Sequence, residues 1–208
     1  MNSITRLITR AVDIVGEQGV ITNSIEMDPY GHDEFATEEF ARPPVAVFRP
    51  ETENQARDLV ALCAENRVPV TPRGAGTGLS GGCVPSVGGV VLSVERLDRV
   101  VEVDTKNQTI TVEAGVPLSK LYEAVEGAGL FFPPHPGDEG ATVGGAVAAN
   151  AGGARAVKYG TVRQFVRGLR VVTASGKMVD LGGKYLKSST GLHLLDLMIG
   201  SEGTLGLI

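Results

Sequence analysis

The chain has 208 residues, of which 42% are hydrophobic and 21% charged, and its formal net charge is −5 at neutral pH. This composition is typical of a globular protein, and it offers no basic face for nucleic acid. No apolar run reaches the roughly 18 residues of a membrane span, and the two cysteines, Cys63 and Cys83, lack metal-ligand spacing. Glycine alone is unusual, because its 28 residues are about twice the average share.

The N-terminal residues 1–19 are predicted to form an amphipathic helix. Charged side chains interrupt its apolar residues, which argues against a signal peptide. The expected buried face consists of Ile4, Leu7, Ile8, Ala11, Val12 and Val15. A polar, turn-rich segment over residues 22–44 then crosses to the main body. We expect a cytoplasmic protein with reduced thiols, and we leave peripheral attachment to a membrane open.

Residues 45–130 are predicted to form a first, strand-rich α+β lobe. Thr52 and Gln55 have the spacing of a capping box, which predicts a helix over residues 51–66. Leu118, Leu121, Tyr122 and Val125 share one face of a second helix, expected over residues 116–129. The strands of this lobe are expected at residues 45–48, 68–72, 90–94, 100–104 and 108–115.

Residues 131–208 are predicted to form a second lobe, which opens with another glycine cluster. The sequence "ASGK" (residues 174–177) indicates a hairpin, and "LHLLDLM" (residues 192–198) indicates a short helix. The final residues, "GTLGLI", have the pattern of a strand that is beginning. An apolar strand edge without a partner favours self-association.

The stretch "PRGAGTGLSGG" (residues 72–82) is rich in glycine, and so much backbone without side chains calls for a physical explanation. Gly76, Gly78 and Gly81 have the spacing G-x-G-x-x-G, but no helix can start after them, which argues against a Rossmann dinucleotide site. A nest of inward-pointing N–H groups holds an anion without a helix, with Arg73 at its entrance. The alternative is a mobile surface loop.

The second glycine cluster has different chemistry. Thr142 is placed to cap a helix that begins at "VGGAVAAN". We expect Gly144 and Gly145 to expose first-turn N–H groups, which would make a second site for an anion or a carbonyl. Alanines at positions 146, 148 and 149 leave space for a flat group beside the helix. The alternative is close packing between helices through small residues.

Four motifs in order now support a family resemblance: "PRGAGTGLSGG", "ATVGGAVAANAGGARAVKYG", "KSSTG" and "GSEGTLG". They resemble the flavin-binding domain of FAD-linked 2-hydroxy-acid oxidoreductases. This group includes the glycolate oxidase flavoprotein subunit and D-lactate dehydrogenases, within the vanillyl-alcohol-oxidase/PCMH superfamily. The resemblance extends over residues 28–208.

The resemblance implies a PCMH-type FAD-binding fold of two α+β subdomains with FAD between them. It implies oxidation of a 2-hydroxy acid such as glycolate or D-lactate, with the flavin as hydride acceptor. The implied cofactor-binding residues are Pro72, Arg73, Gly74, Ala75, Gly76, Thr77, Gly78, Gly81, Gly82, Pro136, Gly137, Asp138, Ala141, Thr142, Gly144, Gly145, Ala148, Asn150, Gly152, Gly153, Tyr159, Gly160, Glu202 and Gly203.

The three histidines bear on how the flavin is held. Some members of the family attach FAD covalently through a histidine in the first loop, but residues 73–82 contain none, so we expect non-covalent FAD. His135 either faces the flavin ring or is a solvated loop residue. His193 is expected to cap or pack on the short helix, and His32 to order the crossing segment.

The sequence offers no cluster of metal ligands and no pair of nucleophile and base, so no catalytic residue is assigned. Family members continue into a cap domain that supplies substrate-binding residues, so we expect this chain alone to be an incomplete enzyme. An electron-transfer subunit is the expected protein partner. The alternatives are an FAD-binding module that acts inside a larger complex and a reductase of a cell-wall precursor.

Overall fold

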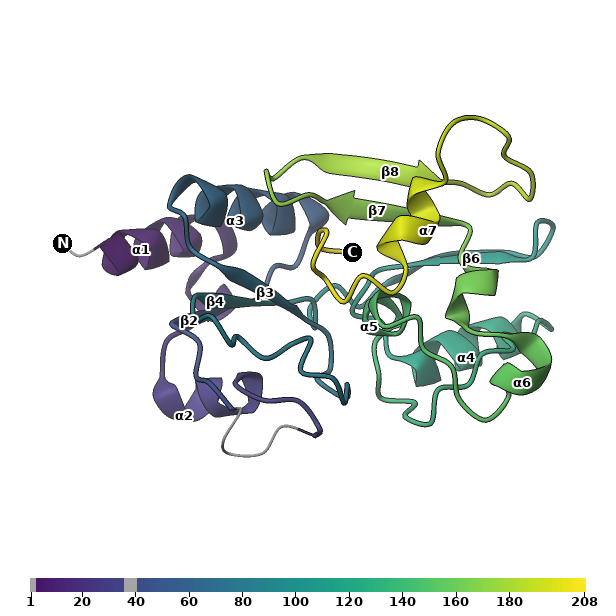
Figure 1. Cartoon of the computed structure of the whole chain (residues 1–208), viewed down its shortest axis with the longest axis horizontal. Helices are drawn as coiled ribbons and strands as arrows, with labels where there is room; N and C mark the ends of the chain where they lie inside the picture. Colours follow the sequence, from purple (N-terminus) through teal and green to yellow (C-terminus); the bar gives the residue numbers. More distant parts are fainter. Residues whose placement is uncertain (1–2, 36–40) are drawn as a thin grey trace.

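The computed structural model describes residues 3–35 and 41–208 of the chain. Two regions lie side by side, with the N-terminal helix at one end of the molecule and the C-terminal residue near its centre (Figure 1). The first region holds a four-stranded sheet, and the second holds hairpins and short helices. Part of the predicted crossing segment, residues 36–40, lies outside the described residues.

The sheet of the first region has the strand order β1-β2-β4-β3. Strands β2, β4 and β3 are parallel, while β1 pairs antiparallel with β2 at the edge. Every residue of β2 and β4 is buried, as expected for parallel strands covered on both faces. The bounds are β1 Val20–Ile21, β2 Ala46–Phe48, β3 Val70–Arg73 and β4 Val90–Ser93.

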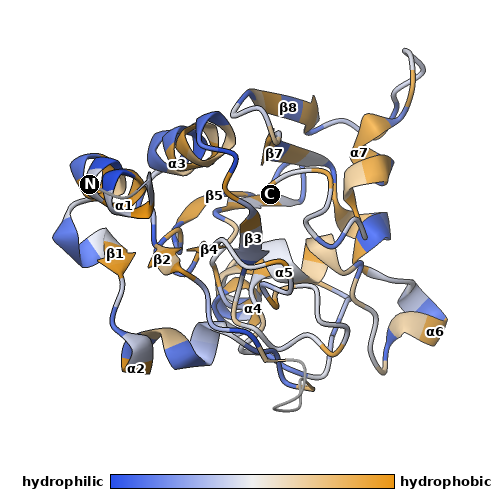
Figure 2. Ribbon diagram, turned by 60° about the vertical axis from the view of Figure 1, so that its left-hand side comes forward, coloured by the Kyte–Doolittle hydropathy of each residue, from blue (hydrophilic) through white to orange (hydrophobic). Residues whose placement is uncertain are grey.

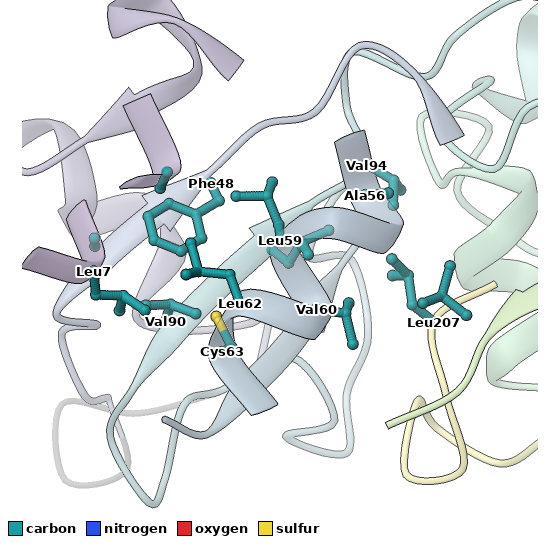
Figure 3. Close-up of a cluster of buried hydrophobic side chains, with 14 of the residues drawn as sticks. Leu7, Phe48, Ala56, Leu59, Val60, Leu62, Cys63, Val90, Val94 and Leu207 are labelled. Carbon is teal, nitrogen blue, oxygen red and sulfur yellow. The ribbon is translucent and has the colours of Figure 1, made fainter. Parts of the chain in front are cut away.

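Helices α1 (Ser3–Val15) and α3 (Glu53–Glu65) pack against each other over one face of this sheet, and both divide polar from apolar residues (Figure 2). Phe48 points from β2 into the core beneath them (Figure 3). Val47, one residue earlier, faces Met27 on the opposite side. The remaining elements before β2 are η1 (Glu17–Gly19), α2 (Ser24–Met27) and η2 (Asp28–Tyr30).

The predicted faces of the two first helices are confirmed. Leu7 and Ala11 of α1 are fully buried, and the other four expected positions are partly buried. Thr52 caps α3, because its hydroxyl accepts a hydrogen bond from the Gln55 N–H at 3.2 Å. The Gln55 side chain returns to the N–H of Glu51 rather than of Thr52, so the box is shifted by one residue.

The second region begins with the antiparallel pair β5 and β6, two strands that the sequence predicts in the first lobe. Its core joins side chains from α4, α5 and α7, among them Leu118, Val147 and Leu195. The elements are β5 Val100–Asp104, β6 Thr109–Val112, α4 Leu118–Gly127, α5 Val143–Ala148, α6 Ala156–Tyr159, η3 Val162–Phe165, β7 Gly168–Val172, β8 Met178–Gly182 and α7 Leu194–Met198.

The hydrophobic clusters divide the chain differently from the expected boundary at residue 130. Helix α4, expected in the first lobe, packs with α5 in the second cluster. Conversely, Val172 of β7 and Leu207 belong to the core beneath α3. The predicted strand at the end of the sequence is seen only as a bridge, in which Leu207 and Val172 exchange two backbone hydrogen bonds of 2.8 and 2.9 Å.

Candidate functional site

Strand β3 ends at Arg73, and the glycine-rich loop (residues 74–82) follows it directly. The Arg73 side chain is only 8% exposed, and it points away from the loop's open side. Its guanidinium donates to the carbonyl oxygens of Pro29 and His32 at 2.7 and 2.6 Å, and it contacts the sulfur of Cys83 at 3.2 Å. The expectation that Arg73 stands at the entrance of an anion nest is therefore wrong.

The backbone N–H groups of the loop are largely free. Within residues 3–35 and 41–208, the N–H groups from Ala75 to Ser80, and that of Gly82, have no hydrogen-bond acceptor. The N–H of Gly81 is the exception, because it donates to the Asp33 carboxylate at 2.6 Å. Because these consecutive donors have no acceptor among the described residues, the loop has the donor set of an anion site.

Most glycines of the loop have a reason within the protein itself. Gly76 and Gly81 have φ values of 82° and 76°, where side chains are strained. A Cβ at Gly74 or Gly82 would collide with Thr142 or Glu202. Gly78 differs, because a Cβ there would meet no heavy atom of the described residues within 4 Å. Contacts with the described residues therefore do not account for its lack of a side chain.

Helix α5 begins as predicted, with Thr142 as its cap. The Thr142 hydroxyl accepts from the N–H of Gly145 at 3.1 Å. The N–H groups of Val143 and Gly144 donate to the carbonyls of Val116 and Ala114, both at 2.8 Å. All three first-turn donors are thus used inside the protein, and the expected second anion site at Gly144 and Gly145 is wrong.

Packing explains Gly144 instead. A Cβ on this residue would lie 2.6 Å from the Cβ of Ala114 and 2.9 Å from its carbonyl oxygen. The residue permits α5 to approach the turn between β6 and α4, rather than another helix. Ala146, expected to leave space for a flat group, is 4% exposed and lies in the second core.

A third glycine-rich loop, "GSEGTLG" (residues 200–206), closes the arrangement. The N–H groups of Gly200 and Glu202 donate to the last turn of α5, at the carbonyls of Val147 and Ala148. Glu202 lies against Gly82, and Gly203 packs on Pro72. The structure therefore brings the three motifs together around the end of β3, with α5 between the first loop and the third.

A cavity of about 560 Å³ adjoins this meeting point. Gly74, Ala75, Gly140 and Thr142 are among the residues that line it. Tyr30, Arg49 and Glu95 also line it and form a hydrogen-bonded cluster, in which the Tyr30 hydroxyl is 2.9 Å from a Glu95 oxygen. Burial raises the pKa of Tyr30, and the Glu95 carboxylate raises it further, so Tyr30 stays a neutral donor there.

Several of the remaining predicted site residues lie around "PPHPG" (residues 133–137). His135 forms a bridge with Gly153, and its ring lies 5.7 Å from that of Tyr122. A Cβ on Gly153 would collide with the His135 carbonyl, and the Asp138 carboxylate accepts from the Gly140 N–H at 2.7 Å. Pro136 and Gly137 connect these two contacts along the chain, and Ala141 accepts from the Leu118 N–H.

The His135 side chain is 30% exposed, and its position facing the flavin ring stays a prediction. With Tyr122, Glu139 and Arg155 it lines a second cavity of about 340 Å³. Farther along the chain, the Asn150 side chain accepts from the Arg163 N–H at 3.2 Å, and Gly152 precedes Gly153 in the turn after α5. The Tyr159 ring meets Phe131, and Gly160 follows with a φ of 85°.

His193 occupies the position before α7, as expected, but its ring makes no capping hydrogen bond and instead contacts Asp196 at 2.8 Å. His32 contacts the neighbouring carbonyl of Asp33, and its own carbonyl accepts from Arg73. Sequence reasoning missed Asp33, since nothing in "YGHDEF" signals that this carboxylate is buried.

Among the described residues, no group of metal ligands and no helix long and apolar enough to cross a membrane is found.

Comparison with known proteins explains the donor-rich loop. A family model described as an FAD binding domain matches residues 44–182. The chain belongs to this FAD-binding domain family. The domain is 45% identical over 208 residues to a D-lactate dehydrogenase of Anaerostipes hadrus, a match that covers 100% of this chain and 43% of that protein. It is 42% identical over 180 residues to the glycolate oxidase subunit GlcD of Bacillus subtilis, which covers 86% and 38%.

Solved structures confirm the PCMH-type α+β fold. An alkyldihydroxyacetonephosphate synthase superposes with a TM-score of 0.85 at 21% identity, over 98% of this chain and 42% of that one. A p-cresol methylhydroxylase gives a TM-score of 0.80 at 18% identity, over 98% and 41%. The FAD-binding domain therefore spans less than half the length of the relatives it matches.

The loop of this chain fits the diphosphate of FAD. A diphosphate presents several anionic oxygens, and the N–H groups from Ala75 to Ser80 are donors that have no acceptor among the described residues. Gly78 adds a shape argument, because the space that a Cβ would fill there is open. The free N–H groups and the open space at Gly78 both agree with the assignment of the chain to an FAD-binding family.

Proposed function

We propose that this chain binds FAD non-covalently, with the diphosphate against the backbone of residues 74–82. The observation that carries the proposal is the run of N–H groups from Ala75 to Ser80 that have no acceptor among the described residues, together with the open space where a Cβ on Gly78 would lie. Residues 73–82 contain no histidine for covalent attachment. Cys83 follows the loop, but its sulfur contacts Arg73, and burial raises the pKa of its thiol.

Each part of the site has a task in this proposal. The N–H groups of the glycine loop bind and orient the diphosphate. Glu202 and Gly203 border the same space, and Thr142 holds α5 in place beside it. Pro136–Asp138 and Asn150–Gly153, with Tyr159 and Gly160, border the flavin from the second region. When bound, the flavin supplies the acceptor for a hydride.

A titration tests cofactor binding. Protein purified natively, or supplied with FAD, should show flavin absorption bands and saturable quenching of flavin fluorescence. Acid precipitation should leave the flavin in the supernatant. Flavin that remains in the pellet would contradict non-covalent attachment, and no binding at any FAD concentration would contradict the proposal as a whole.

The proposed reaction class is oxidation of a small 2-hydroxy acid. Relatives named D-lactate dehydrogenase and glycolate oxidase subunit support it, and they share 45% and 42% of aligned residues with this chain. Anaerobic addition of D-lactate or glycolate to the FAD-loaded chain should bleach the flavin band, whereas L-lactate is the matched control. Equal bleaching by L-lactate would contradict a site for the D-hydroxy acid.

A second candidate is an FAD-binding module that needs another domain or subunit for turnover. It is favoured by the relative that is named as a subunit of glycolate oxidase, since a subunit acts together with a partner. Bound FAD that D-lactate does not bleach would support the module. Steady turnover near ~10 per second by this chain alone would exclude it.

A further inference from the structure

Residues 29–34, which join η2 to the rest of the crossing segment, lie directly against the glycine loop. Arg73 reaches from the start of the loop into this segment, and Asp33 reaches from the segment to the loop's far end. The contacts are Arg73 Nη2 to the Pro29 carbonyl at 2.7 Å, Arg73 Nη1 to the His32 carbonyl at 2.6 Å, the Gly81 N–H to Asp33 Oδ2 at 2.6 Å, and the Glu34 N–H to the Gly78 carbonyl at 3.2 Å.

Both charged side chains of this arrangement are buried. Asp33 is 4% exposed and Arg73 is 8% exposed. A buried charge is costly unless hydrogen bonds satisfy it. Backbone groups of the opposite segment supply several of these bonds, and Asp33 also accepts from the Phe35 N–H of its own segment at 3.1 Å. Breaking the contact between the segment and the loop would remove both carbonyl acceptors of Arg73 and the Gly81 donor of Asp33, so the contact is held strongly.

The contacts constrain one side of the loop and leave the other free. The segment uses the carbonyl of Gly78 and the N–H of Gly81, while Arg73 fills the space beneath Gly76. The N–H groups from Ala75 to Ser80 keep no acceptor among the described residues. The loop is therefore fixed through one face, and its donors remain available on another.

We propose that residues 29–34 are a latch that holds the glycine loop in its binding shape, with Asp33 as the positioning residue. The latch precedes residue 44, where the match to the family model begins. The identity of the ligand, FAD, rests on the proposed function, whereas the effect of residues 29–34 on the loop does not. Five glycines give residues 74–82 unusual freedom when unrestrained, and a loop ordered before binding loses less entropy when FAD arrives.

The test compares Asp33→Asn and Asp33→Ala with a matched acidic control, Asp28→Asn, whose exposed side chain lies outside the latch. The first readout needs no FAD. In the wild-type chain the Gly81 amide proton should lie downfield in an NMR spectrum and exchange slowly. In Asp33→Ala that proton should move upfield, and exchange should quicken at residues 78–83 while β3 and β4 stay protected.

The second readout is FAD affinity. Asp33→Ala should weaken binding about 10- to 100-fold, as expected for the loss of a hydrogen bond to a charged group, and Asp33→Asn should weaken it less because it retains an acceptor. Asp28→Asn should bind as the wild type does. The absorption spectrum of the bound flavin should be the same in all variants, since the latch acts on affinity rather than on the ring.

Two results would overturn the latch: a Gly81 amide that is unchanged in Asp33→Ala, or a folded Asp33→Ala with wild-type affinity. If Asp33→Ala does not fold, the Gly81 amide and the affinity of Asp33→Asn decide the question. If the wild type binds no FAD, the proposed function fails, and the exchange experiment still tests whether Asp33 holds the loop.

Discussion

The two glycine clusters of this chain look alike in sequence and differ in what their backbones do. In the loop after β3, the N–H groups from Ala75 to Ser80 have no acceptor among the described residues. At the start of α5, the N–H groups of Val143, Gly144 and Gly145 all have partners within the protein. Glycine therefore leaves backbone donors free in the first cluster and permits tertiary packing in the second.

The largest expected effect comes from Gly144→Val. A β-branched side chain at this position would overlap Ala114, whose Cβ would lie 2.6 Å from the new Cβ. Backbone on both sides of the contact leaves little room to relax, so we expect a loss of about 3 kcal/mol or more in the free energy of unfolding. Chemical denaturation would measure it, with Gly127→Ala on the open side of α4 as the control.

Gly78→Val tests the first cluster, where we expect a loss of FAD affinity without a loss of stability. Nothing in the described residues lies within 4 Å of the new Cβ, so the free energy of unfolding should stay within about 0.5 kcal/mol of the wild-type value. FAD affinity should fall at least tenfold, because the side chain occupies the space given to the diphosphate. Leu79→Ala, an exposed neighbour, is the control. Unchanged affinity in a folded Gly78→Val would remove the contrast between the clusters.

Thr142→Ala should give a smaller change, confined to stability. The variant loses the hydroxyl that accepts from the Gly145 N–H, and the loss of such a helix cap costs about 1 kcal/mol. Thr142→Ser keeps the hydroxyl and should retain most of that stability. Thermal unfolding followed by circular dichroism would measure both variants. A larger loss in Thr142→Ser than in Thr142→Ala would show that the methyl group, and not the cap, matters.

The smallest effect concerns thiol reactivity. Burial raises the pKa of Cys63 to about 12, and burial also raises the pKa of Cys83. Since the thiolate is the reactive form, both cysteines should react slowly with a thiol reagent at pH 7, and the Cys83 rate should rise with pH. Because Cys83 adjoins the glycine loop, FAD should slow its labelling. Equal protection of Cys63, which lies beneath α3, would indicate a global effect.

The sequence predicts local features well where one segment contains the whole cause. Thr52 and Gln55 predict the start of α3, and Thr142 predicts the start of α5. The sequence does not predict which acceptor each backbone N–H finds. The N–H of Gly144 donates to Ala114 and that of Gly81 to Asp33, and both acceptors are distant along the chain. Residue types show which donors a segment has, and only the tertiary structure shows which of them are already used.

The family motifs predicted the first and third loops, but they did not predict which site residues lie where these loops meet and which lie around His135. The two sets follow one another along the chain, and the turn after α5 places Gly152 and Gly153 beside His135, where Gly153 forms a bridge. Arg73 was misjudged for a related reason. A cation beside a glycine loop suggests an anion ligand, but this one is satisfied by the carbonyls of Pro29 and His32.

The β7–β8 hairpin returns from the second region and packs on α3 of the first. Arg170 pairs with Glu53 of α3 at 2.6 Å, but this pair is half exposed and contributes little to stability. The firmer link is apolar, since Val172 and Leu207 lie in the core beneath α3. The two regions are therefore joined by apolar packing as well as by the chain that connects them, and separating them would expose Val172 and Leu207 to water.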